Sequence, residues 1–462
     1  MNGVQLRSEP EPRLIVVAAG ALLLMWPCLL NWHPYLFWDT YSYFLQGRAY
    51  AVVLMAATGA GAVPPEAAPG WIGAAERLLA EDASIRSIPY SLLLYVVAAL
   101  GSFWTLAAIN AATAAATIEV FLVRLCRLDL PRRLAVFGIL AAISSLPWYA
   151  TFLMPDLFAG LLILAVLLLA LVPQRLCGTE RLGLSLLALL AITFHSSHLL
   201  LAFVLVPLAV LLAPAARLAV AGRLGAIVVA GLALLLTSAW LAFGRAELAP
   251  NSPPFLLARA YADGPVRQFL ETRCATESWV LCDRLDQLRD DANEFLWNKE
   301  RSYWEWRDQR QHMRDEQMAL VARAVATYPL TQLRASLANT VQQLTMVGLD
   351  DLVTGRGALV AYDDYQFLYM PTAPAARWGL GAFTLLVQAS AVGGVLVLAI
   401  ALWRRRLPPE MRRAVFVTAA ALVANAAICG ALSGAHDRYE ARVIWLVPLL
   451  AASAMLQRRP AG

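Results

Sequence analysis

Residues 157–172 read LFAGLLILAVLLLALV, an apolar run without a charged side chain. A helix needs about 20 apolar residues to cross the roughly 30 Å hydrocarbon core of a bilayer, and similar runs recur along the chain. Hydrophobic residues make up 60% of the 462 residues and charged residues only 15%, a balance far from that of a soluble protein. The sequence therefore predicts an all-α polytopic membrane protein. Hydropathy averaged over a sliding window predicts about ten spans. They begin near Leu14, Phe103, Leu134, Leu157, Leu182, Leu199, Leu224, Leu380, Ala414 and Val443.

Basic residues gather in alternate short loops, at residues 124–133, 175–181, 217–223 and 404–413. Because basic loops stay on the cytoplasmic side, we expect both termini to be cytoplasmic and the first span to be an uncleaved signal anchor. These loops account for the net charge of +5, so we expect a lipid bilayer and no nucleic acid as a partner. The apolar run at residues 88–100 is too short to cross upright, which predicts an interfacial or re-entrant helix.

Three regions without an internal repeat are expected along the chain. Residues 1–243 hold seven spans and a first outer loop at residues 33–87. Residues 244–377 form a mostly helical extracytoplasmic insertion, and residues 378–462 supply three further spans.

The insertion carries two local signals. From Met318 to Met346 apolar residues recur at helical spacing with a break at Tyr328-Pro329, which predicts two amphipathic helices that meet at the proline. Cys274 and Cys282 both fall in this segment, where an oxidising compartment favours a disulfide over two free thiols.

Asp39 lies in the stretch WDTYSYF, only a few residues after the first span. The residue could simply cap a helix that begins at Thr40, since aspartate is a favoured N-cap residue. The surrounding aromatic residues favour a catalytic role instead, because a partly desolvated carboxylate at a lipid boundary can act as a general base toward a hydroxyl. Trp38 and Tyr41 are then candidate substrate contacts.

Asp156 follows Pro155 at the outer end of the fourth span. A Pro-Asp pair often starts a helix, and a functional role is equally compatible with this position. If the turn before the fourth span packs beside the first outer loop, Asp39 and Asp156 form a pair of carboxylates. Such a pair could hold a divalent cation such as Mg or Mn, or divide the roles of base and orienter.

His195 and His198 are expected in the outer turn between the fifth and sixth spans, where a spacing of three places both on one helical face. We expect a structural or hydrogen-bonding role rather than a metal site, with a contact to a substrate phosphate as the alternative. The acidic pairs at residues 350–351 and 363–364 are expected to be solvated turns.

Arg438 and Tyr439 are expected where the ninth span emerges on the outer side, against the inside preference of basic residues. The partner of Arg438 is then either Asp437 or Glu440, in a surface ion pair that contributes little, or a phosphate. Arginine binds phosphate with two parallel hydrogen bonds.

The order of these features resembles that of the C-type (GT-C) integral-membrane glycosyltransferases: an acidic residue in the first outer loop, a short interfacial helix, a Pro-Asp turn and an Arg-Tyr pair near the last span. The resemblance implies a donor sugar on a polyprenyl phosphate and an active site at the outer membrane face. By this likeness Asp39 would match the first-loop catalytic acid, Asp156 the second acidic position and Arg438 a donor-phosphate contact. A single acidic residue follows the first span where many members have two, so the metal requirement stays open.

The expected function is transfer of the sugar to an extracytoplasmic glycan, lipid or protein acceptor, with inversion at the anomeric carbon. Asp39 would accept the acceptor's proton, and a cation beside the departing phosphate would stabilise the transition state. The alternatives are a lipid or glycan transporter or flippase, or a catalytically inactive accessory subunit. Arginine-rich, lysine-poor usage suggests a bacterial inner-membrane protein whose active site faces the periplasm.

Overall fold

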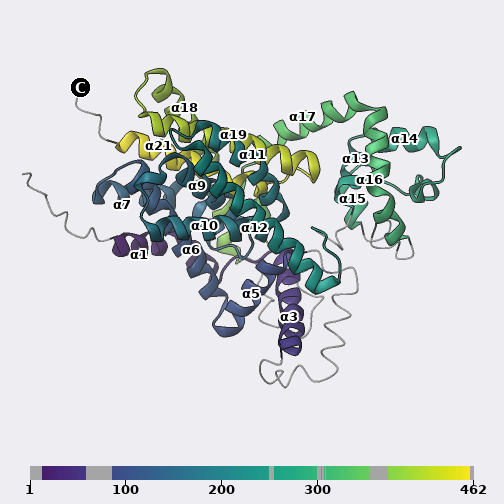
Figure 1. Cartoon of the computed structure of the whole chain (residues 1–462), viewed down its shortest axis with the longest axis horizontal. Coiled ribbons are helices and arrows are strands. Elements are labelled where there is room, and N and C mark those ends of the chain that lie inside the picture. The colour runs from purple at the N-terminus through teal and green to yellow at the C-terminus, as the bar shows by residue number, and fades with distance from the viewer. Residues whose placement is uncertain are drawn as a thin grey trace, which may run out of the picture.

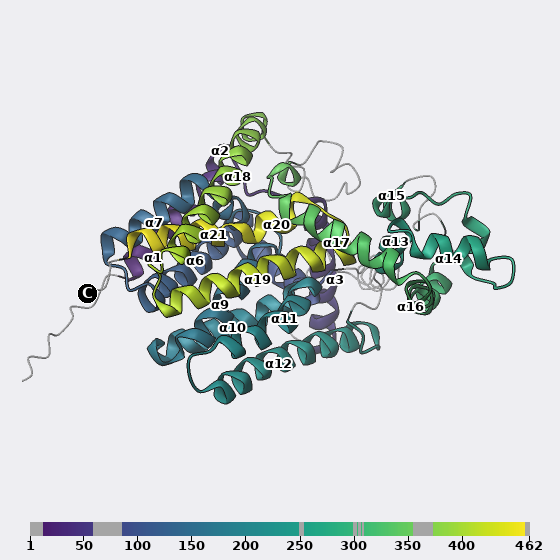
Figure 2. The same cartoon turned by 90° about the horizontal axis from the view of Figure 1, so that it is seen from above.

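Helices packed side by side form the larger part of the molecule, and a group of shorter helices stands at one end of them (Figures 1 and 2). The structure is a computed structural model that describes residues 13–58, 86–248, 254–298, 303, 306, 309–353 and 373–457, and the named elements in these ranges are all helical. The first part of the bundle consists of α1 (Arg13–Leu24), α2 (Trp26–Asn31), α3 (Trp38–Thr58), α5 (Ile88–Leu100), α6 (Phe103–Val120), η2 (Phe121–Leu125), α7 (Leu130–Ile143), α8 (Leu146–Ala150), α9 (Leu157–Leu171), η3 (Pro173–Arg175), α10 (Gly178–Phe194), α11 (Ser196–Leu212) and α12 (Arg217–Phe243).

The second half of the chain leaves the bundle and returns to it. The helices at the far end are α13 (Phe255–Ala262), α14 (Pro265–Arg273), η4 (Val280–Arg284), α15 (Ala292–Trp297) and α16 (Arg310–Thr327). The returning elements are α17 (Pro329–Thr345), η5 (Asp350–Leu352), α18 (Pro374–Trp403), α19 (Pro409–Leu432), α20 (Asp437–Ile444) and α21 (Leu446–Leu456).

The structure supports an all-α membrane protein but not the expected number of spans. The helices at four expected spans, α7, α9, α10 and α11, contain only 14, 15, 17 and 17 residues, so the count of ten is not confirmed. Helix α9, which contains the apolar run at residues 157–172, is buried along its whole length. It is apolar on every side because it is surrounded by other helices. Within the described ranges six stretches are long and apolar enough to cross a bilayer: Arg13–Asn31, Phe103–Leu125, Arg217–Phe243, Ala376–Trp403, Pro409–Leu432 and Asp437–Leu456.

The basic loops meet at one end of the bundle. Glu180, in the first turn of α10, pairs with Arg13 at 2.7 Å and with Arg124 at 2.9 Å. Arg175 pairs with Glu410 at the start of α19, at 2.6 Å. These pairs join the loops at residues 124–133, 175–181 and 404–413 to one another and to the start of α1, so three of the four loops that we expect to be cytoplasmic share one end.

The segment expected to be the first outer loop contains helix α3, which begins at Trp38, two residues before the helix start that the sequence analysis considered as one alternative. Helix α3 packs against α5, whose bounds match the short helix expected at residues 88–100. A Cβ atom on Gly47 would lie 2.0 Å from the backbone oxygen of Ser91. Because neither backbone can move away independently, only glycine allows the two helices to approach this closely.

Buried apolar residues form two separate cores. The smaller core belongs to α13, α14, α15 and α16 and to the loops between them. Val347, Leu349 and Leu352 already belong to the large core of the bundle. The independently packed part of the insertion therefore ends near Tyr328, well before residue 377. Helices α16 and α17 meet at Tyr328-Pro329, so the two predicted helices are present.

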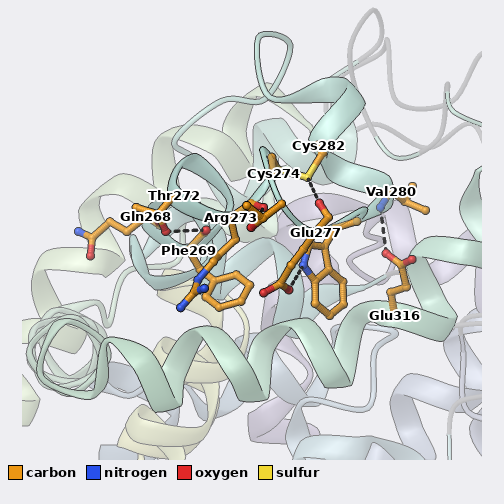
Figure 3. The surroundings of a disulfide bond; sticks show 11 residues. Gln268, Phe269, Thr272, Arg273, Cys274, Glu277, Val280, Cys282 and Glu316 are labelled. Carbon is orange, nitrogen blue, oxygen red and sulfur yellow. Dashed lines mark hydrogen bonds between the residues drawn. A yellow bond between two sulfur atoms is a disulfide. The ribbon is translucent and has the colours of Figure 1, made fainter.

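Cys274 and Cys282 form a disulfide in the insertion, with their Cα atoms 5.5 Å apart (Figure 3). The Cys282 sulfur lies 3.7 Å from the Glu277 carbonyl oxygen, within the same loop. The bond therefore ties the end of α14 to η4.

Replacing both cysteines of this disulfide by serine is expected to destabilise the insertion by about 2–3 kcal/mol, the loop-closure value for a separation near eight residues. Trypsin should then cleave the full-length protein faster at Arg273 and Arg284, which flank the loop. Cys177→Ser, which removes an exposed free thiol, is the control. Unchanged cleavage rates in the double variant would contradict the prediction.

Candidate functional site

The segment around the start of α3 packs directly against the turn that precedes α9. The Tyr35 amide donates to the Thr151 carbonyl and the Leu153 amide donates to the Tyr35 carbonyl, both at 2.9 Å. The Thr40 hydroxyl donates to the Leu153 carbonyl at 3.1 Å. This is the packing that the sequence analysis required for Asp39 and Asp156 to share one surface.

Asp39 is held between two arginines. It lies in the first turn of α3, which begins at Trp38, and the Thr40 hydroxyl accepts the Phe37 amide at 2.9 Å. The alternative of Asp39 as the N-cap is therefore wrong. One carboxylate oxygen pairs with Arg86, and the other lies 3.5 Å from an Arg438 nitrogen.

Arg86 was not among the residues singled out from the sequence. It directly precedes Ser87, the N-cap of α5, and its amide donates to the Gln46 side chain at 3.1 Å. The cap of α5 and the close contact between α3 and α5 thus place its guanidinium beside Asp39. Its planar group also lies over the Tyr43 ring, at 5.6 Å from the centroid.

Asp156 does not act as a helix cap. It occupies the N-cap position of α9 but its side chain makes no cap hydrogen bond. One carboxylate oxygen lies 3.5 Å from Arg442, and both side chains are buried. Arg442 belongs to a stretch long and apolar enough to cross a bilayer, Asp437–Leu456, and a buried charge in such a stretch needs a partner.

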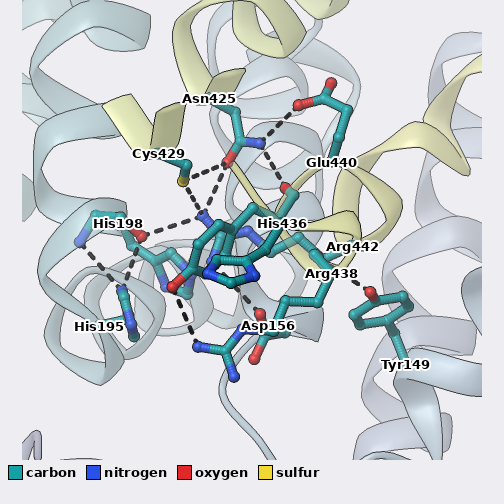
Figure 4. A network of polar contacts seen from close by, with 12 residues as sticks. Tyr149, Asp156, His195, His198, Asn425, Cys429, His436, Arg438, Glu440 and Arg442 are labelled. Carbon is teal, nitrogen blue, oxygen red and sulfur yellow. Dashed lines mark hydrogen bonds and ion pairs between the residues drawn. The ribbon is translucent and has the colours of Figure 1, made fainter. Parts of the chain in front are cut away.

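The Arg442 guanidinium joins several helices (Figure 4). It donates to the Asn425 side-chain oxygen at 2.9 Å, to the Ser197 hydroxyl at 3.1 Å and to the Cys429 sulfur at 3.2 Å. With Asp156 these residues form what we call the Arg442 cluster. The cluster connects α9, α11, α19 and α20, so the sequence separations within it are large.

Arg438 lies one turn before Arg442 and is also buried. Its guanidinium carbon is 4.5 Å from the Phe37 ring centroid and 4.9 Å from that of Tyr439, and one nitrogen donates to the Tyr439 hydroxyl at 3.2 Å. The alternative of a surface ion pair with Asp437 or Glu440 is wrong, because the buried guanidinium pairs with Asp39 instead. The other terminal nitrogen, Nη1, is buried without a hydrogen-bond partner among the described residues.

Several contacts fix the start of α20. The Asp351 carboxylate accepts the Arg438 amide at 2.9 Å, and Asp437 accepts the Gly348 amide at 2.7 Å. The Tyr149 hydroxyl donates to the Arg438 carbonyl at 3.0 Å. The expectation that residues 350–351 are merely a solvated turn is therefore wrong for Asp351. The pair at residues 363–364 lies outside the described residues.

The two histidines lie near each other, with ring centroids 5.4 Å apart. His195 has an extended backbone between α10 and α11, so it does not share a helical face with His198. Its Nδ1 is 2.8 Å from the Ser197 hydroxyl, which accepts from Arg442. Desolvation by the surrounding protein, and then the nearby His198, lower the pKa of His195 well below its usual value, so its ring is neutral at pH 7.

His198 is buried and its Nδ1 lies 2.8 Å from the Ala191 carbonyl oxygen. This bond ties α11 back to α10, in keeping with the expected structural role. His436, just before α20, packs its ring against Tyr439 at 5.6 Å. Burial lowers the pKa of His436, so its ring also adds no positive charge beside Arg438 at neutral pH.

The aromatic side chains around Asp39 differ in their exposure. Trp38 is 52% exposed, whereas Tyr41 is buried. The rings that contact the arginines are those of Phe37, Tyr43 and Tyr439. Tyr43 belongs to the same aromatic stretch as Asp39, and Phe37 directly precedes that stretch, so aromatic residues on both sides of Asp39 contact the arginines of the site.

In the ranges that the structure describes, no three His, Cys, Asp or Glu side chains gather in an arrangement that could hold a metal ion. Asp39 and Asp156, the expected pair, each face an arginine. Comparisons with family models, with curated proteins and with solved structures find no match for this chain.

Proposed function

We propose that this protein is a membrane glycosyltransferase that moves a sugar from a polyprenyl-phosphate donor to an extracytoplasmic acceptor with inversion. The pair of Asp39 and Arg438 carries the proposal. It places a candidate base and a candidate phosphate ligand side by side, from opposite ends of the chain and beside the Phe37 ring. In the same proposal the membrane is the bacterial inner membrane and the site faces the periplasm.

The reaction needs a base at the acceptor and a cation at the leaving group. Asp39 takes the proton of the acceptor hydroxyl as its oxygen attacks the anomeric carbon. The bond between that carbon and the phosphate oxygen breaks, and the electron pair leaves with the lipid phosphate. Arginine binds phosphate through two parallel N–H groups, and the buried Nη1 of Arg438 is free for this purpose in the described part of the chain.

Arg438 can serve both groups in turn. Without a donor it neutralises part of the charge on Asp39. A guanidinium that turns toward a phosphate gives up part of this pairing, which makes the carboxylate a better proton acceptor. Donor binding and base activation are then linked through one side chain. In this proposal the arginines neutralise the phosphate, and a divalent cation such as Mg or Mn is the alternative.

A flippase is the second candidate function. The buried pair of Arg442 and Asp156 is the kind of intramembrane charge that also marks transport paths. An inactive accessory subunit is the third, and it predicts that Asp39 is dispensable. All three candidates are compatible with this fold. They differ in whether the protein transfers a sugar, moves a lipid-linked sugar across the membrane or does neither.

Asp39→Asn is expected to lower sugar transfer by at least about 100-fold, because general-base catalysis contributes 10²–10⁴. Transfer is measured in membranes from expressing cells supplied with polyprenyl-phosphate sugars. Asp290→Asn, at an exposed carboxylate in the insertion, is the matched control, and melting temperatures show that both variants fold.

Transfer at the wild-type rate in Asp39→Asn would refute the base assignment. A protein that moves lipid-linked sugars across the membrane of a vesicle, without transferring the sugar to an acceptor, would instead be a flippase. Absence of both activities in every form would support the accessory subunit.

A further inference from the structure

Helix α17 turns an apolar face outward. Leu330, Leu333, Leu337 and Val341 are each between 55% and 65% exposed. Their spacings of three and four place them on one face of the helix. The exposed stripe therefore runs along most of the length of α17.

The opposite face of α17 is polar and bonded to the protein. Gln332 and Asn339 donate to the two carboxylate oxygens of Asp263 at 2.8 and 2.9 Å. Gln343 donates to the His436 carbonyl at 2.8 Å and accepts the His436 amide at 3.0 Å. A surface helix in water has the reverse arrangement, with apolar residues toward the core.

The position of α17 on α19 indicates what the exposed stripe contacts. Phe416 and Val423 are exposed on α19, a helix long and apolar enough to cross a bilayer. Gly430 lies seven residues after Val423, two turns further along the same face. A Cβ atom on Gly430 would lie 2.6 Å from the Asn339 backbone oxygen. Helix α17 thus covers the part of α19 that would otherwise continue its lipid-facing surface (Figure 2).

We propose that α17 is embedded in the outer part of the bilayer, with Leu330, Leu333, Leu337 and Val341 in contact with lipid acyl chains. Its outer face then continues the lipid-facing surface that Phe416 and Val423 begin on α19. Arg334 interrupts the stripe and α17 has only 17 residues, so it enters the interface rather than crossing the membrane.

The embedded helix connects the membrane to both parts of the molecule. Through Asp263 it holds α13, and with it the disulfide-bearing insertion, at the membrane surface. Through His436 it holds the residue that precedes Arg438 by two positions. The inference is independent of the proposed enzymatic function, since it depends only on the two faces of α17.

The test is a nitroxide scan of α17 in phosphatidylcholine vesicles, with single cysteines placed at residues 330–342 of a Cys177→Ser background. The remaining free cysteines are buried. Collision rates with oxygen, which concentrates in lipid, and with a water-soluble nickel chelate are compared. At Leu337→Cys we expect oxygen collisions to dominate, with maxima that recur at Leu333→Cys and Val341→Cys.

Ala326→Cys, on the exposed side of α16, is the matched control and should show the opposite preference for the chelate. Chelate collisions at Leu337→Cys equal to those at Ala326→Cys would show that α17 faces water and would overturn the proposal. Spin–spin broadening at Leu337→Cys that disappears on dilution with unlabelled protein would show that a second copy covers the stripe, which would also overturn it. Melting temperatures of the labelled proteins identify any variant that does not fold, and the neighbouring stripe positions then replace it.

Discussion

Arg442→Ala is expected to destabilise the folded protein by about 3–5 kcal/mol, the usual result of removing one partner from a buried ion pair. The arginine is fully enclosed, and Asp156 would become a buried carboxylate without its cation. Asn425, Ser197 and Cys429 would also lose their shared donor. Unfolding of the purified protein by heat or by a denaturing detergent measures the change.

Two further variants separate the buried charge from lost packing. The double change Asp156→Leu and Arg442→Met should recover most of the stability, because apolar residues of similar volume often replace a buried pair without loss. Arg175→Ala, which removes a partly exposed pair with Glu410, should cost only about 0–1 kcal/mol. If the double variant were less stable than Arg442→Ala alone, the explanation by an uncompensated charge would be wrong.

Arg438→Ala is expected to lower kcat/KM for sugar transfer by about 10²–10³, the effect of removing one preorganised group that stabilises developing charge. The fold should survive better than in Arg442→Ala, because Asp39 keeps its pair with Arg86. Arg438→Lys should recover only part of the rate, since lysine keeps the charge but not the planar pair of donors.

A control variant at a distant arginine makes this test specific. Arg284→Lys, in the insertion and far from Asp39 along the chain, should transfer at the wild-type rate. If Arg438→Ala bound and transferred the sugar as well as the wild type, Arg438 would not be the phosphate ligand. The pair with Asp39 would then serve the fold alone.

Local patterns in the sequence were sufficient for some of the structure. The bounds of α5 and the break between α16 and α17 at Tyr328-Pro329 follow from the length of an apolar run and from a proline. The apolar composition was sufficient for the class of fold, because hydrophobicity over a window of residues decides whether a segment avoids water. Composition was not sufficient for the number of spans. Helix α9, for example, is enclosed by other helices along its whole length, and burial inside a protein favours the same apolar residues as a membrane does.

The candidate site depended on contacts that no local pattern contains. Asp39 and Asp156 were found from their positions beside predicted spans, whereas Arg86 and Arg442 were missed because their partners are distant in the sequence; Arg442 and Asp156 are 286 residues apart. The sequence likewise did not determine which face of α17 packs against the protein, because the periodicity defines two faces but not which one meets the other helices. Sequence alone determined that this chain is helical and apolar, through properties that each segment carries by itself. Tertiary structure alone decided which charges are paired and which face of α17 is left exposed, since both depend on what packs against them.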